Sequence, residues 1–146
     1  MTALHIALGV AAVVVNLAAG AWGGWAWWQE REARGFWPLL RTGQALVAIE
    51  AAIGVVMLLS GTDLPPLHLV YGLTPLAVAL LAEQLRLAAA QTELDHRELG
   101  GRDAVAALPE AEQRALVRAI LRRETGVMAA SALVVALLGV RASGWL

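Results

Sequence analysis

The sequence predicts an all-α integral membrane protein, a four-helix antiparallel bundle that forms one domain over residues 1–146. Of these residues 59% are hydrophobic and 16% are charged, and the mean hydropathy is +0.64, which is too apolar for a soluble domain of this length. A membrane-crossing helix needs about 20 mostly apolar residues. Four stretches meet that requirement, namely residues 3–28, 38–60, 65–90 and 125–140.

The arginines indicate how the four spans cross the membrane. The chain has no lysine, and its arginines lie in or beside two of the three connections: Arg31, Arg34 and Arg41 between spans one and two, and Arg86, Arg97, Arg102, Arg114, Arg118, Arg122 and Arg123 between spans three and four. Positive residues stay on the cytoplasmic side. We therefore expect both termini and the connection at 60–66 to face outward, with Arg141 as the exception.

The composition limits the functional classes. Cysteine is absent, which excludes disulfides and thiolate metal sites, and the net charge of −1 gives no reason to expect nucleic-acid binding. The N-terminus has no basic leader followed by a cleavage site, so we interpret it as a retained first span. The alanine-rich, lysine-free composition is typical of a bacterium with a GC-rich genome. We expect a multi-pass protein in the lipid bilayer of a bacterial plasma (inner) membrane.

Turn residues mark the ends of the spans. Pro38 is tolerated in the first turn of the second span. The segment "SGTDLPP" ends that span, and Thr62 or Asp63 is expected to cap the third. Because this connection is short, spans two and three should be antiparallel neighbours.

Residues 91–124 form the one polar region, which we place in the cytoplasm. Pro109 stands at a helix start with acidic residues early and arginines late, and we expect this amphipathic helix to run on into span four. The segment is interpreted either as a solvated helix packed on the bundle or the lipid headgroups, or as a surface that docks a membrane protein partner. His96 within it should be solvated.

Small residues recur on one face of each of the first two spans. The spacing of three and four residues places a stripe of mostly small residues on a single helix face. In span one this stripe consists of His5, Gly9, Ala12, Asn16, Ala19 and Gly23. Span two repeats the pattern with Gly43, Val47, Glu50, Gly54, Met57 and Gly61. Such stripes let helix backbones approach closely, because lipid supplies no hydrophobic force between helices. They would also admit a flat cofactor, and both interpretations stay open.

Glu50 lies midway along span two, where a carboxylate costs about 2.5 to 3.5 kcal/mol by insertion scales. We expect it to face the interior of the bundle. One interpretation is a neutral side chain that is hydrogen-bonded to Asn16 or to a backbone carbonyl. The other is a role in proton transfer or ligand contact.

Two histidines should enter the membrane at a similar depth from the outer face. His5 lies near the start of span one and His68 near the start of span three, with Gly9 and Gly72 one turn further in. Two imidazoles on alternate helices above small residues suit the axial ligation of an iron porphyrin. A histidine at a helix end is also a common polar anchor at the membrane surface, and this second interpretation stays open.

The face of span three that carries His68 adds further candidates. Tyr71, Gly72 and Pro75 share it, and Pro75 leaves the carbonyl of Tyr71 without its helical donor. Met57, in the outer third of span two, is a fallback axial ligand. The predicted cofactor is heme b, with His5 and His68 on the metal and with Gly9, Met57, Tyr71 and Gly72 beside it.

Residues 3–90 resemble a known family in helix order and histidine position. The segment "RTGQALVAIEAAIGVVMLLSGTDLPPLHLVYGLTPLAVALL" is similar to a paired-helix segment of heme A synthases, in which the second helix begins with a heme-ligating histidine. Cytochrome b-type bundles are a looser likeness of the same kind. The chain lacks the second four-helix half of those synthases, the glutamate one turn before their first histidine and their outer-loop cysteines. What the resemblance implies is heme binding by His5 and His68, without heme A synthesis.

The leading hypothesis is a small membrane protein that binds one b-type heme for electron transfer, heme handling or a respiratory assembly. The alternatives are a cofactor-free accessory subunit that docks a partner through residues 91–124, and a small transporter-like protein, possible as a homodimer, that uses Glu50 and Asn16. No nucleophile with a base, phosphate-binding loop or pair of hydrolytic carboxylates is evident. No catalytic residue is therefore predicted.

Overall fold

The computed structural model describes residues 2–63 and 65–144. All regular structure in these ranges is helical, as predicted, and consists of α1 (Thr2–Trp28), α2 (Phe36–Leu59), α3 (Pro66–His96), α4 (Arg102–Ala106) and α5 (Glu110–Ala142). Four of these helices, α1, α2, α3 and α5, are long and apolar enough to cross a membrane. The prediction of an all-helical chain with four such helices is confirmed.

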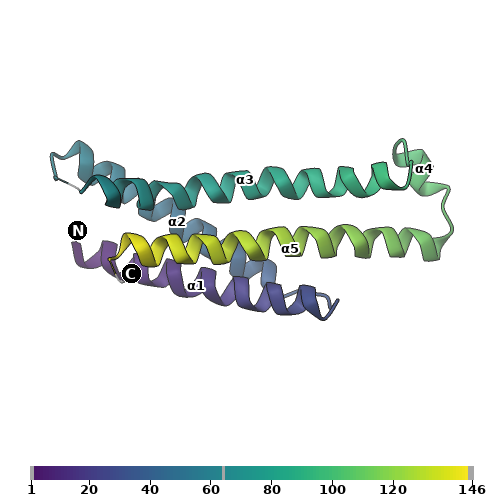
Figure 1. Cartoon of the computed structure of the whole chain (residues 1–146), viewed down its shortest axis with the longest axis horizontal. Helices are drawn as coiled ribbons and strands as arrows, with labels where there is room; N and C mark the ends of the chain where they lie inside the picture. The colour runs from purple at the N-terminus through teal and green to yellow at the C-terminus, as the bar shows by residue number, and fades with distance from the viewer. Residues whose placement is uncertain (1, 64, 145–146) are drawn as a thin grey trace.

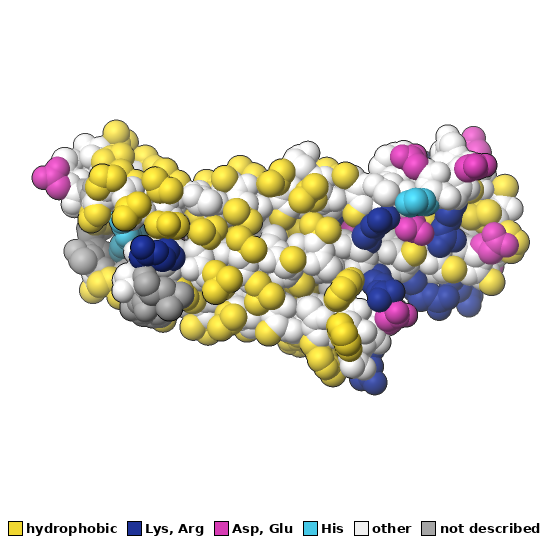
Figure 2. Space-filling model, in the orientation of Figure 1, with side chains coloured by type: hydrophobic (Ala, Val, Ile, Leu, Met, Phe, Trp, Pro, Cys, Tyr) yellow, Lys and Arg dark blue, Asp and Glu magenta, His cyan; other side chains and the backbone are white. Residues whose placement is uncertain are grey.

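The four long helices form a bundle in which each packs against two neighbours. Helix α1 contacts α2 and α5, and α3 contacts the same two helices from the other side, so that α1 and α3 lie diagonally across the bundle. Both termini and the α2–α3 connection lie at the same end (Figure 1). We call this the terminal end, and the opposite end, where most arginines gather (Figure 2), the arginine end.

Helices α3 and α5 are longer than the spans expected from hydropathy. Helix α3 continues to His96, an exposed residue that therefore lies in a helix and not in a loop. Pairs at the i,i+4 spacing extend this helix: Gln91 donates a hydrogen bond of 2.8 Å to Asp95, and Arg97 pairs with Glu93 at 3.1 Å. Helix α5 runs unbroken from Glu110 to Ala142, which confirms that the amphipathic helix continues into span four. The α3–α5 pair projects beyond α1 at the arginine end (Figure 1).

The expected cap of α3 by Thr62 or Asp63 is wrong. Pro65 occupies the N-cap position without a side-chain hydrogen bond, and Pro66 lacks an N–H that would need one. Thr62 instead helps to close the C-terminal end of α2, because its N–H donates a hydrogen bond of 3.1 Å to the carbonyl of Met57. The N–H of Gly61, a residue at φ +80°, donates a hydrogen bond of 3.1 Å to the carbonyl of Leu58. This double closure is a Schellman motif, which glycine favours because it adopts positive φ without strain.

The tightest packing lies towards the arginine end. A buried cluster there joins all four long helices through mostly small side chains: Ala19, Phe36, Leu40, Ala82, Met128, Ala129 and Ala132. A Cβ atom added at Gly23 would lie 2.5 Å from the ring of Phe36, and one added at Gly20 would lie 2.6 Å from Leu133. These glycines therefore permit a backbone approach that no larger residue would allow.

Polar contacts supplement this packing. Asn16 is 1% exposed, donates a hydrogen bond of 2.8 Å to the carbonyl of Ala12, and lies so close to Gly43 that an added Cβ would approach its Nδ2 to 2.8 Å. Between α2 and α3, Glu83 pairs with Arg41 and accepts a hydrogen bond of 2.9 Å from Gln44. These contacts fix α2 against α1 on one side and against α3 on the other.

We expect Gly23→Ala to destabilise the bundle by about 1 to 3 kcal/mol, because the added methyl overpacks against the buried Phe36 ring. Gly24→Ala is the matched control, since a Cβ at that position meets no atom within 4 Å and alanine favours the helix by about 0.5 to 1 kcal/mol. Thermal unfolding in detergent, followed by circular dichroism, measures both. Equal midpoints for the two variants would contradict the packing described above.

Candidate binding cavity and its histidine pair

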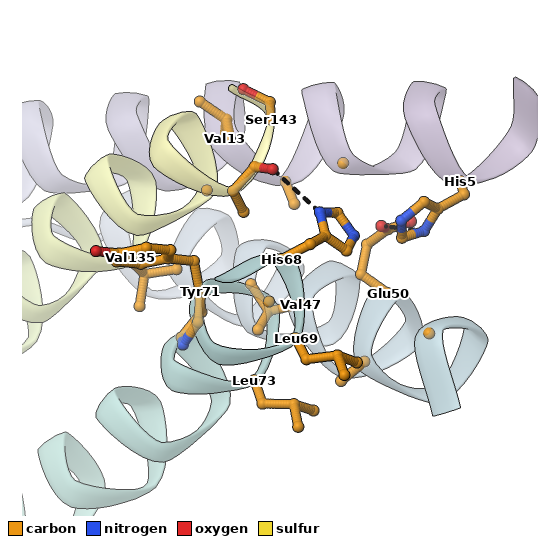
Figure 3. Close-up of a pocket in the computed structure, with 18 of the residues that line it drawn as sticks. His5, Val13, Val47, Glu50, His68, Leu69, Tyr71, Leu73, Val135 and Ser143 are labelled. Atoms are coloured by element: carbon orange, nitrogen blue, oxygen red, sulfur yellow. Dashed lines mark hydrogen bonds and ion pairs between the residues drawn. The ribbon is translucent and has the colours of Figure 1, made fainter. Parts of the chain in front are cut away.

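A cavity of about 450 Å³ lies inside the bundle at the terminal end. All four long helices line it, and its wall is mostly apolar, with Val47, Leu69, Leu73 and Val135 among the lining residues (Figure 3). The polar side chains that line it are His5, Glu50, His68, Tyr71 and Ser143. Small-molecule and cofactor sites are typically pockets of about 300 to 1,000 Å³ with apolar walls and a few polar groups.

The cavity exists because Gly9, Gly54 and Gly72 have almost no packing partners at this end. A Cβ added at Gly54 or Gly72 would meet no atom within 4 Å, and one added at Gly9 would meet only the carboxylate of Glu50, at 3.5 Å. Further along the same stripes, Gly23 and Gly43 are in tight contact with neighbouring side chains. Each stripe therefore packs helices in one half of the bundle and lines open space in the other.

His5 and His68 meet across this cavity. They come from the diagonal helices α1 and α3, and their ring centroids are 5.9 Å apart with an interplanar angle of 71°. Figure 3 shows the two rings next to each other, with the side chain of Glu50 of α2 rising between them towards His5. Two residues separated by more than sixty positions thus share one site.

The ring of His68 is oriented by the end of α5. Its Nδ1 lies 3.1 Å from the carbonyl oxygen of Ala142, the last residue of that helix (Figure 3). A carbonyl only accepts hydrogen bonds, so Nδ1 carries the proton and donates it. The lone pair is then on Nε2, and this is the tautomer in which a histidine can ligate a metal.

The ring of His5 is held by a carboxylate. Its Nδ1 lies 2.7 Å from Oε2 of Glu50, with side-chain exposures of 21% and 16%. This is the distance of an ion pair, but its angles are not those of a hydrogen bond: among the described residues, Nδ1 of His5 and Oε1 of Glu50 are both buried without a hydrogen-bond partner. Glu50 therefore keeps acceptor capacity at the cavity wall.

Other predicted site residues fall inside and outside the cavity. Tyr71 and Pro75 line it, whereas Met57 does not, so nothing favours Met57 as a ligand. Asn16 lies outside the lining and bonds to its own helix at Ala12. The hydrogen bond between Asn16 and Glu50, which was one of the interpretations left open for this carboxylate, is not formed: Asn16 bonds to Ala12, and Glu50 lies against His5.

The contribution of α5 is the part of the site that sequence reasoning missed. Small residues recur on this helix at gaps of four, three and four, namely Ala132, Ala136, Gly139 and Ser143, and the last two line the cavity. The spacing test applied to the first two spans would have found them. The carbonyl of Ala142 leaves no trace in the sequence, because every residue carries one.

Comparisons with protein-family models, curated proteins and solved structures find no match to this chain. Within residues 2–63 and 65–144, no group of three or more His, Cys, Asp or Glu side chains could hold a metal ion. The chemistry of the site therefore rests on its own geometry, a pair of oriented imidazoles above an apolar cavity.

The cavity can be tested without reference to any ligand, because the chain has no cysteine. We expect Gly72→Cys to be alkylated by a small uncharged thiol reagent at least tenfold faster than Ala132→Cys in detergent. Position 72 faces open space, whereas Ala132 is 1% exposed in the core, and thiol reactivity follows accessibility. Mass spectrometry over time measures both rates. Equal rates would mean that the cavity is closed in solution.

Proposed function

We propose that this protein is a membrane four-helix bundle that binds one b-type heme through His5 and His68, for electron transfer, heme handling or a respiratory assembly. The observation that carries the proposal is the pair of rings from α1 and α3, 5.9 Å apart. Each ring has its Nδ1 at a partner, the carbonyl of Ala142 for His68 and the carboxylate of Glu50 for His5. The hydrogen bond of His68 leaves its Nε2 for a ligand, and His5, whose Nδ1 makes an ion-pair contact without a hydrogen bond, keeps a ring nitrogen for one as well.

The spacing of the rings fits a shared metal. Metal–imidazole bonds are about 2 Å long, so rings whose centres are 5.9 Å apart would both be able to hold one iron ion. A porphyrin supplies the other four ligands itself. Two protein ligands are then enough, which agrees with a site that brings two histidines together.

The walls of the cavity fit a flat apolar molecule. Gly9, Gly54 and Gly72 leave space on three helices beside the histidines, and Val47, Pro75 and Val135 form apolar walls. A bound heme supplies one-electron chemistry. The protein's own part is to orient both imidazoles and to exclude water from the porphyrin face with these apolar side chains.

The partners of the two rings give the site a defined asymmetry. An acceptor that is hydrogen-bonded to the other ring nitrogen fixes the orientation of a ligating histidine and raises its basicity. For His68 that acceptor is the carbonyl of Ala142, whereas His5 has the carboxylate of Glu50 in ion-pair contact and no hydrogen bond at Nδ1. The contact with His5 gives the carboxylate in the middle of this apolar helix an ion-pair partner.

The arginines support one orientation in the membrane. Outward-facing termini and a cytoplasmic α3–α5 extension would follow the positive-inside rule, since the arginine end carries most of the positive charge (Figure 2). The histidine pair would then lie near the outer leaflet of a bacterial plasma membrane. A respiratory or heme-transfer partner could reach this leaflet from outside or within the membrane.

We expect the purified protein, mixed with hemin and then separated from unbound hemin by gel filtration, to show a Soret band that His68→Ala abolishes, because one of the two residues that would hold the iron is then lost. His96→Ala is the matched control, since this histidine is exposed at the far end of α3. Absorption spectra of the reduced and oxidised protein measure the effect, and circular dichroism verifies that each variant folds. Wild-type protein that is colourless after unbound hemin has been removed would rule out the heme and leave a cofactor-free accessory subunit.

A further inference from the structure

We propose that Arg141 and Tyr71 form a carboxylate subsite at the mouth of the cavity, which receives the propionates of the porphyrin and thereby sets its direction of insertion. The inference rests on the proposed function, because the ligand of the subsite is part of the heme. Beyond the proposed function, it states which edge of the porphyrin would face the mouth of the cavity and which would face its apolar walls.

A second, smaller hollow adjoins the main cavity at the terminal end. Its volume is about 240 Å³, and its lining includes Pro65 and Arg141. It shares His68, Tyr71, Ala142 and Ser143 with the main cavity. The two spaces are therefore neighbours on either side of His68, and a molecule bound at this histidine could reach both.

Arg141 is the arginine of the terminal end, since the others lie in or beside the connections at the arginine end. Figure 2 shows a basic side chain at the terminal end beside a histidine, far from the main group of basic side chains. The guanidinium carbon of Arg141 lies 5.3 Å from the centre of the Tyr71 ring. Stacking on an aromatic face orients the planar guanidinium, whose donors match a carboxylate in a fork geometry.

The polarity of the site matches that of the ligand. Protoporphyrin carries both its carboxylates along one edge, and the remainder of its rim is apolar. The combined space has an arginine and a serine hydroxyl at its mouth, at Arg141 and Ser143, and apolar walls at Val47 and Val135. Insertion with the carboxylates outward satisfies both parts, whereas the reverse direction would bury two charges against valines.

The test compares two ligands and three proteins. Hemin and its dimethyl ester, which has no carboxylates, are titrated into wild type, Arg141→Gln and Arg118→Gln, and absorbance at the Soret band gives each Kd. We expect wild type and Arg118→Gln to bind hemin about tenfold more tightly than the ester. This ratio corresponds to the low end of the range for charge-assisted hydrogen bonds, and we choose the low end because Arg141 is exposed. Arg141→Gln should bind hemin as weakly as the ester, with its affinity for the ester unchanged.

The outcomes separate the subsite from the heme site itself. Wild type that binds both ligands equally, with a Soret band that His68→Ala abolishes, would overturn the subsite and keep the proposed function. Loss of affinity for both ligands in Arg141→Gln would also overturn it, because a structural defect does not distinguish an acid from its ester. Wild type that binds neither ligand would overturn both proposals.

Discussion

The close approach of helix backbones at small residues is the constraint on which the rest of the structure depends. Lipid is as apolar as leucine, so helices in a bilayer associate through packing and polar contacts. In this bundle the contact is made where Gly20 and Gly23 of α1 admit Leu133 and Phe36, and where Gly43 of α2 admits Asn16. These positions hold α1 against both of its neighbours, and Glu83 with its partners ties α3 to α2.

The same small residues produce the cavity at the other end. Helices that are held in close contact towards the arginine end continue past each other at the terminal end, where no bulky side chains fill the space beside Gly54 and Gly72. Polar groups that would be costly in lipid gather at this opening. A carboxylate in the middle of a membrane-crossing helix costs about 2.5 to 3.5 kcal/mol, and the contact of Glu50 with His5 would reduce that cost if α2 crosses a membrane. Packing and candidate site are therefore two consequences of one sequence pattern.

Helix α5 connects the two ends of the molecule. It begins in the polar extension at Glu110 and ends at Ala142, whose carbonyl orients His68. In a single uninterrupted helix the positions of the two ends are fixed relative to each other, whereas a loop between two segments would let them move independently. The extension at the arginine end and the wall of the cavity at the terminal end therefore belong to one rigid element, and Met128 and Ala132 in its middle are buried in the core.

The sequence by itself determined the helical class, the four apolar helices and the residues that share each helix face, because hydropathy and a period of 3.6 residues are properties of one segment at a time. It also placed His5 and His68 one turn from small residues at corresponding helix ends. Only the tertiary structure decided that Glu50 pairs with His5 and not with Asn16, that Thr62 closes α2, and that a carbonyl of α5 orients His68. These contacts depend on how each helix is rotated about its axis towards its neighbours, which no single segment specifies.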